Sequence, residues 1–356
     1  MTYKYPVIDA HYHILDGWFN WDGQTFTEST EEYLRNSGLK TLNVCAVPFL
    51  EEYKTDVSNN IVIALCKLQM PELYIHGGLV YENAPVPETL PTELSPETQY
   101  RELMEIGFDG IKMIETKPCE LRRLGRPIDD PVFDNWFSEI EKNGTHMVWH
   151  VADPAYFWKR ECVSQEIIDC GWFYGDGTYP TQERIYEQVE NVLQRHPKLN
   201  VTFAHFYFLG DDPARLERLF ETYSNVNVDI TPGCEMYVSF SKDTEFWRSF
   251  FTRFADRIEF GTDTADESAG SASLPDIVYR FLTEDTAQDI WNVQCRGLAL
   301  DEDVARRILH DNFTRRVGKQ PKTIDRAALK RYIEKYRYMI KDHDILERID
   351  RAAAEL

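Results

Sequence analysis

The chain has 356 residues, of which 43% are hydrophobic and 13% aromatic, and this composition excludes a disordered protein. Its formal net charge of -21 at pH 7 argues against nucleic acid and acidic membranes as partners, because both repel a strongly negative protein. The sequence holds neither the run of about 20 apolar residues that spans a bilayer nor an apolar secretory signal near its start, so we expect a cytoplasmic protein that binds small molecules.

Eight short β-rich stretches recur along the chain, separated by longer stretches of helical period. This alternation is typical of a parallel sheet with crossover helices, and eight strands are the number that closes a TIM barrel. We therefore predict an α/β fold of the (β/α)₈ barrel class. The predicted strands are residues 7–13 (VIDAHYH), 41–47, 73–81, 109–114, 146–151, 200–206, 225–230 and 257–263.

Helices are expected between these strands, and several carry their own start and stop signals. Ser95 and Thr181 are typical N-terminal caps, whereas Gly107 and Gly144 stand where a helix should end. The predicted helices are residues 30–38, 95–107, 130–144, 181–197 and 212–223.

Two regions interrupt the alternation. Residues 152–180 are too long and too aromatic for a plain connector, which predicts a lid or pocket wall after the fifth strand. Residues 319–356 have helical period and many charges, which predicts a C-terminal helical extension that packs on the barrel (1–318) or on another subunit of a homo-oligomer. The aromatic residues of the insertion either line a pocket for a planar substrate or pack within the loop, and the candidates are Tyr156, Trp158, Trp172 and Tyr174.

Ionisable side chains fall at or near the ends of five predicted strands. His11 and His13 end the first strand and share one face, because side chains two apart in a strand point the same way. The others are Lys112 in the fourth strand, His150 in the fifth, His205 in the sixth and Asp263 in the eighth. Since catalytic groups gather at the carboxyl ends of barrel strands, we expect these residues to meet at one mouth.

Each of these residues also has an ordinary interpretation. A single histidine such as His150 or His205 is more often a hydrogen-bonded core residue than a ligand, and Asp263 fits a helix cap. Lys112 either binds a substrate carboxylate or pairs with a carboxylate inside the barrel. Taken together, however, imidazole nitrogens and a carboxylate oxygen suit Zn²⁺ or a similar divalent ion, which lowers the pKa of a bound water from about 15.7 toward about 7.

The order of these residues resembles the amidohydrolase superfamily. The matching motifs are HxH in strand one, a histidine in strands five and six, and the aspartate of FGTD in strand eight. The stretches VTFAHF, YSNVNVDITPG and ILHDNFTRRVG resemble its amidohydrolase-related branch, which holds hydrolases, lactonases and non-oxidative decarboxylases. The likeness runs from about residue 7 to residue 318.

This resemblance implies a role for each motif residue. His11, His13, His150 and Asp263 would hold the metal, and His205 would be the general acid/base. Asp263 would also take a proton from the metal-bound water. Binuclear relatives bridge two metals with a strand-four lysine, but Lys112 in DGIKMIE resembles the branch in which this lysine is not a bridge, so one metal is expected, Zn²⁺ or alternatively Mn²⁺ or another divalent ion.

We therefore predict a metal-dependent hydrolase in which metal-activated water attacks a lactone, ester or amide carbonyl. The alternatives are a metal-dependent decarboxylase of an aromatic or unsaturated acid, and a barrel that binds ligands without catalysis. Arg122 lies in a basic run after strand four that either binds a substrate carboxylate or faces water. Tyr207, just beyond His205, is a further candidate for contact with substrate or for support of the site.

Overall fold

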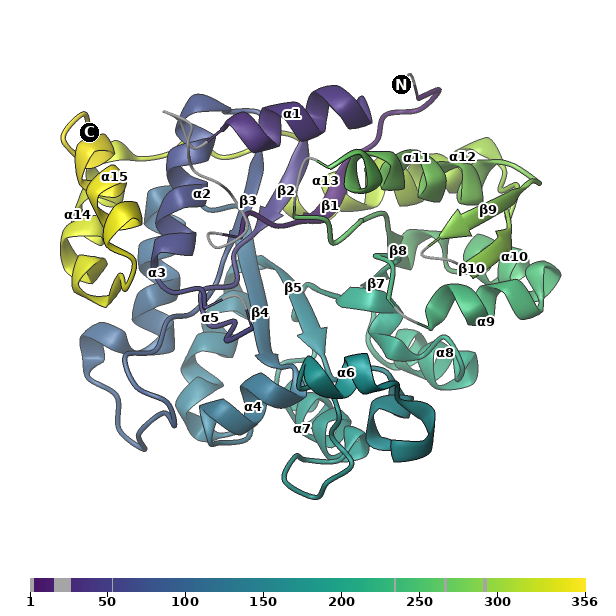
Figure 1. Cartoon of the computed structure of the whole chain (residues 1–356), viewed down its shortest axis with the longest axis horizontal. Helices are drawn as coiled ribbons and strands as arrows, with labels where there is room; N and C mark the ends of the chain where they lie inside the picture. The colour runs from purple at the N-terminus through teal and green to yellow at the C-terminus, as the bar shows by residue number, and fades with distance from the viewer. Residues whose placement is uncertain (1–2, 16–26, 53, 234, 266–267, 291–292) are drawn as a thin grey trace.

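The computed structural model describes residues 3–15, 27–52, 54–233, 235–265, 268–290 and 293–356 (Figure 1). Its centre is a barrel of eight parallel strands in which each strand pairs with its neighbours in chain order. The strands are β1 (Asp9–Tyr12), β2 (Leu42–Cys45), β3 (Tyr74–Gly77), β4 (Gly110–Thr116), β5 (His146–Val151), β6 (Val201–Phe203), β7 (Val226–Asp229) and β8 (Ile258–Glu259). A parallel bridge between Tyr12 and Thr264 links β1 to the segment after β8. The predicted TIM barrel is confirmed.

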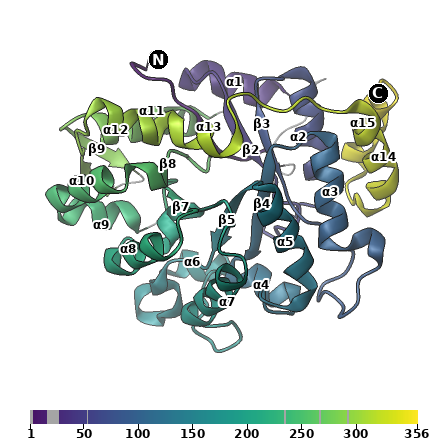
Figure 2. The same ribbon diagram turned by 180° about the vertical axis from the view of Figure 1, so that it is seen from behind.

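Helices surround the barrel, as Figures 1 and 2 show from opposite sides. They are α1 (Glu28–Ser37), α2 (Ser58–Gln69), α3 (Pro96–Ile106), α4 (Pro118–Leu124), α5 (Asp134–Asn143), α6 (Gln165–Asp169), α7 (Gln182–Arg195), α8 (Pro213–Thr222), α9 (Met236–Lys242), α10 (Thr244–Arg253), α11 (Ala269–Thr283), α12 (Glu302–Arg306), α13 (Asn312–Val317), α14 (Arg326–Tyr336) and α15 (His343–Ala353). A short antiparallel hairpin, β9 (Ala287–Ile290) and β10 (Val293–Arg296), follows α11. Nowhere in the described ranges is a helix long and apolar enough to cross a bilayer. The cytoplasmic location stays a prediction.

The predicted helix signals act as expected. The hydroxyl of Ser95 accepts a hydrogen bond from the backbone N–H of Thr98 at the start of α3, and Thr181 does the same for Arg184 at the start of α7. Gly107 ends α3 with a φ of 108°, in the left-handed region that glycine adopts without strain.

A buried polar network lies inside the barrel at the end where the strands begin, opposite the end that carries His11 and His13. His76 Nε2 lies 2.9 Å from His146 Nδ1, and the other nitrogen of His146 lies 2.9 Å from the Thr202 hydroxyl. Thr202 in turn donates to Glu259, which pairs with Arg316 at 3.4 Å. These groups bind one another, so they close this end of the barrel.

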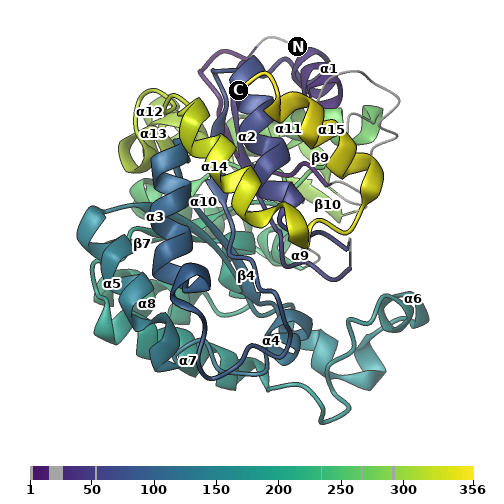
Figure 3. The same ribbon diagram turned by 90° about the vertical axis from the view of Figure 1, so that its left-hand side faces the viewer.

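The two interrupting regions form distinct structures. Residues 152–180 contain two short 3₁₀ turns and α6, and Figure 3 shows α6 projecting from the barrel. The C-terminal helices α14 and α15 lie over α2 and α3 (Figure 3). The buried ion pair between Lys67 Nζ and Asp109 Oδ2 (2.5 Å) supports this junction, because Asp109 also accepts the backbone N–H of Lys322. The division of the chain at Gly318 and its association with another subunit stay predictions.

Candidate metal centre

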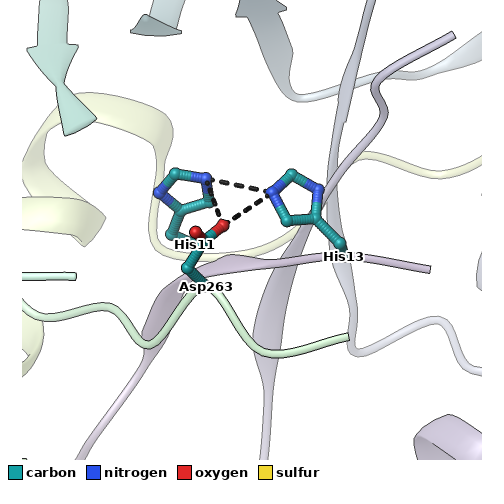
Figure 4. Close-up of side chains that lie close together, drawn as sticks. All are labelled: His11, His13 and Asp263. Atoms are coloured by element: carbon teal, nitrogen blue, oxygen red, sulfur yellow. Dashed lines mark hydrogen bonds and ion pairs between the residues drawn. The ribbon is translucent and has the colours of Figure 1, made fainter. Parts of the chain in front are cut away.

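Three predicted ligands meet at the carboxyl end of the barrel. The nearest nitrogen of His11, that of His13 and a carboxylate oxygen of Asp263 all lie within 4.8 Å of one another (Figure 4). His13 Nε2 is 3.2 Å from His11 Nε2 and 3.0 Å from Asp263 Oδ1, and His11 Nε2 is 3.4 Å from the same oxygen. Both histidines are buried, whereas the Asp263 side chain is 27% exposed and reaches the cavity.

The hydrogen bonds of the two histidines determine which nitrogen carries a lone pair. His13 Nδ1 lies 2.7 Å from the carbonyl of Cys45, which can only accept, so Nδ1 carries the proton. His11 Nδ1 lies 2.9 Å from Asp229 Oδ2, and the ionised carboxylate imposes the same tautomer. Two nitrogen lone pairs and one carboxylate oxygen therefore converge, and this donor set fits a divalent metal ion.

The FGTD segment requires its glycine in order to bring Asp263 to this position. A Cβ on Gly261 would lie 2.7 Å from the Thr231 hydroxyl and 3.0 Å from the Cβ of His11. Asp263 itself has a φ of 56°, and its backbone N–H donates to the carbonyl of His11 at 2.7 Å.

Lys112 reaches this group from β4. Its ammonium lies 2.7 Å from His11 Nε2, inside the barrel, and the residue is 2% exposed. Burial lowers the pKa of Lys112, and it also lowers the pKa of His11 to about 4, an effect that the Lys112 charge increases. His11 is therefore neutral at pH 7.

His205 stands beside Asp263 in an unusual turn. It follows β6 in a segment, Ala204–Phe208, whose residues His205 to Phe208 all have φ between 50° and 58°. Its Nδ1 lies 3.3 Å from the carbonyl of Thr231, which places the proton there, and its Nε2 lies 3.7 Å from Asp263 Oδ2. Burial lowers the pKa of His205 to about 4, so Nε2 is an unprotonated base at neutral pH.

His150 lies near this centre but outside the group of three within the described chain. Its ring centroid is 5.0 Å from that of His205. Its Nε2 donates to the carbonyl of Ala152 at 2.9 Å and lies 3.2 Å from Asp153 Oδ1, so Nδ1 is the nitrogen that keeps a lone pair. Its role as a metal ligand stays a prediction.

Two carboxylates support the site: Asp9, on the strand face that also carries His11, and Asp229, at the end of β7. Asp229, at the end of β7, binds His11 through Oδ2 and the backbone N–H of His205 through Oδ1 at 2.8 Å. Asp9 accepts from the backbone and the hydroxyl of Thr262, at 3.0 and 2.6 Å, and so positions the segment that carries Asp263. Asp229 ends a predicted strand, and the strand-end rule that selected His150 would also have found it.

A further network centres on Asp153, just after β5. Lys117 Nζ lies 3.0 Å from Asp153 Oδ2, and the Tyr174 hydroxyl donates to the same oxygen at 2.6 Å. Burial would raise the pKa of Asp153, but the Lys117 charge and the hydrogen bonds outweigh it and hold that pKa below its ordinary value. Asp153 is therefore an anion that orients His150. Lys117 was not selected from the sequence, although it directly follows β4.

These groups open into a cavity of about 530 Å³. Its wall contains His13, His150, His205 and Asp263 together with Lys112, Lys117 and the apolar residues Phe157, Trp172 and Leu274. Of the predicted substrate contacts, the structure brings Lys112 and Trp172 to this wall.

The other predicted contacts lie elsewhere within the part of the chain that is described. Tyr174 donates a hydrogen bond to the wall residue Asp153 but does not itself line the cavity. Trp158 donates to the Pro180 carbonyl, Tyr156 packs on Phe157, and Arg122 stacks over Tyr179, 4.0 Å from its ring centroid. Tyr207 is buried in the core against Phe203 and Tyr186, because the left-handed turn directs it away from the cavity.

Comparison with known proteins gives a family match and a set of structural neighbours. The sequence matches the amidohydrolase family profile over residues 8–317. The fold is similar to that of an uncharacterized TIM-barrel protein from Bordetella bronchiseptica (14% identity, TM-score 0.54, covering 87% of this chain and 97% of that one). It is also similar to a 2,6-dihydroxybenzoate decarboxylase from Rhizobium (15% identity, TM-score 0.53, covering 88% of this chain and 98% of that one). A third similar structure is a 4-oxalomesaconate hydratase from Rhodopseudomonas palustris (12% identity, TM-score 0.51, covering 87% of this chain and 95% of that one). At these identities the likeness shows the fold alone. No curated protein matches the sequence.

Proposed function

Because this chain belongs to the amidohydrolase family, we propose that it is a metal-dependent hydrolase that cleaves a lactone, ester or amide of a small molecule. The observation that carries the proposal is the convergence of ligand atoms from His11, His13 and Asp263 within 4.8 Å of one another, with His205 Nε2 3.7 Å from Asp263 Oδ2, at the mouth of the barrel. Such a mouth is where the catalytic groups of TIM-barrel enzymes lie.

The residues that would hold the metal are His11, His13 and Asp263, with His150 contributing through Nδ1. Zn²⁺ is the ion that this set of nitrogen and oxygen donors favours, and Mn²⁺ is the alternative. When bound, such an ion polarises a carbonyl and lowers the pKa of water.

The protein groups supply the proton transfers. In hydrolysis, the oxygen of a water molecule forms a bond to the carbonyl carbon, and His205 Nε2 accepts the proton that this water loses. The bond to the leaving oxygen or nitrogen then breaks, and His205 returns the proton to that atom. Asp263, 3.7 Å from His205 Nε2, stabilises the imidazolium in between. Phe157, Trp172 and Leu274 give the cavity an apolar wall that would contact the apolar part of a substrate.

Non-oxidative decarboxylation is a second candidate because two ammonium groups, those of Lys112 and Lys117, line the cavity. They would bind the carboxylate of an acid substrate. In that reaction the bond between the carbon and the carboxylate breaks, CO₂ leaves, and the carbon takes a proton from water, relayed by His205 or Asp263, which leaves hydroxide.

Three measurements test the proposal. Purified protein should contain about one divalent ion per chain by elemental analysis, and added Zn²⁺ or Mn²⁺ should raise its melting temperature. A panel of lactones, esters, amides and aromatic acids separates released carboxylate from released CO₂.

His205→Asn should lower kcat by about 10²–10⁴-fold while the bound metal remains. Loss of the metal in this variant would identify His205 as a ligand instead. A protein that binds no divalent ion and turns over no substrate of the panel would leave the non-catalytic barrel as the remaining interpretation.

A further inference from the structure

We propose that the Lys112 ammonium donates a hydrogen bond to the lone pair of His11 Nε2 in the metal-free chain, and that a metal ion displaces this ammonium when it binds. The proposal rests on the metal centre described above. Its consequence is that Lys112 weakens metal binding, in contrast to a lysine that would help to hold the ion.

The Lys112 ammonium and a metal ion compete for one lone pair of His11. His11 Nδ1 is committed to Asp229 as a donor, so Nε2 offers a single lone pair. Lys112 Nζ lies 2.7 Å from that nitrogen, at hydrogen-bond distance. A lone pair that accepts a proton donor cannot coordinate a metal at the same time. Binding through His11 Nε2 therefore requires the ammonium to leave.

The charges of the site also favour a cation at this position. Without a cation, the lone pairs of His11 and His13 and the Asp263 carboxylate would face one another at 3.0 to 3.4 Å, which is repulsive. Lys112 is the ammonium in contact with this group, and it also interacts favourably with the charges of Asp263 and Asp229. The lysine thus stabilises the metal-free site through its positive charge, as a bound divalent ion would.

The cavity beside Lys112 offers space for the displaced ammonium. Lys112 is one of the residues that line the cavity of about 530 Å³, so its ammonium has an open region to enter when it leaves His11. There it would be free to bind an anionic group of a substrate. Metal loading would then also expose a cation for substrate binding.

The test compares metal affinities by competition with a chelator. Lys112→Met removes the ammonium and keeps an unbranched side chain, and Lys67→Met is the matched control, because Lys67 is a buried lysine paired with Asp109 away from the site. We expect Lys112→Met to bind Zn²⁺ at least about tenfold more tightly than the wild type, equivalent to about 1.4 kcal/mol, while its metal-free form melts at a lower temperature. Lys67→Met should lose stability with no change in the dissociation constant.

Lys112→Gln gives an independent test if the Met variant does not fold without metal. Its amide can still donate to His11 but carries no charge, so its Zn²⁺ affinity should lie between those of the wild type and Lys112→Met. An unchanged or weaker affinity in both Lys112 variants would overturn the inference and leave the metal centre intact. Absence of Zn²⁺ and Mn²⁺ binding in every variant would instead overturn the metal centre itself.

Discussion

Replacing Asp229 by asparagine tests whether a carboxylate outside the ligand set controls the tautomer of His11. Asp229 accepts from His11 Nδ1 at 2.9 Å through one oxygen and from the backbone N–H groups of His205 and Thr231 through the other, at 2.8 and 3.1 Å. The amide oxygen of asparagine can keep the two backbone donors. Its NH₂ group then faces His11 Nδ1 and can only donate, so the His11 proton moves to Nε2, where the metal needs a lone pair.

The expected size of the effect follows from these contacts. Loss of a carboxylate that orients a metal-bound histidine costs about 10–100-fold in metal affinity, which is about 1.4–2.7 kcal/mol. The folded variant lacks one charge-assisted hydrogen bond that the wild type makes. We therefore expect the free energy of unfolding of the metal-free protein to fall by about 1.5–3 kcal/mol.

Chelator competition measures the affinity of Asp229→Asn, and urea unfolding measures its stability. Glu259→Gln is the control, because Glu259 is a buried carboxylate on the neighbouring strand β8 that contacts Thr202 and Arg316 at the closed end of the barrel. The control should lose stability and keep the wild-type metal affinity. If Asp229→Asn binds Zn²⁺ as tightly as the wild type, His11 Nε2 is not the ligand or Asp229 does not set its tautomer.

Trp172→Ala should raise KM about tenfold with a small change in melting temperature, since Trp172 forms part of the cavity wall; a large fall in melting temperature with an unchanged KM would contradict this. Tyr174→Phe removes the hydroxyl that donates to Asp153 and should cost about 1–3 kcal/mol in urea unfolding, because a buried acceptor loses a partner. Glu235 has no hydrogen-bond partner for either oxygen among the described residues, and burial raises its pKa from 4.5 to about 8. The folded chain therefore holds this proton more tightly than the unfolded chain, and the free energy of unfolding should fall between about pH 4.5 and about pH 8. Glu235→Gln should flatten that dependence in unfolding curves across this range, and equal slopes for both proteins would exclude Glu235 as its source.

The barrel could be predicted because its strands carry a local signal. All eight predicted segments overlap an observed strand, and each segment is a short β-rich run between turn or helix signals. The helix α2, by contrast, has no amphipathic signal in the sequence. Ten of its twelve residues are buried, since α14 and α15 cover its outer face, so it shows no alternation of apolar and polar sides.

The candidate ligands could be predicted from their positions, but their partners could not. His11, His13 and Asp263 are brought together because strands β1 and β8 adjoin when the barrel closes. The hydrogen bonds that select their lone pairs come from the Cys45 carbonyl and from Asp229, which lie 32 and 218 residues away in the sequence. A spacing rule cannot assign a tautomer that depends on contacts so distant along the chain.

The turn after β6 shows why the neighbours of a candidate site residue can be misplaced. Extended backbone through residue 206 was expected, yet His205 to Phe208 adopt the left-handed conformation, which costs about 1–2 kcal/mol for each non-glycine residue. The interactions that offset this cost are distant in sequence: Asp229 accepts the backbone N–H of His205, and Tyr186 donates to the carbonyl of Tyr207. Strain of this kind persists where the surrounding structure enforces it, and it is concentrated at functional sites. Here its effect is to turn Tyr207 into the core and to hold His205 Nε2 3.7 Å from Asp263 Oδ2.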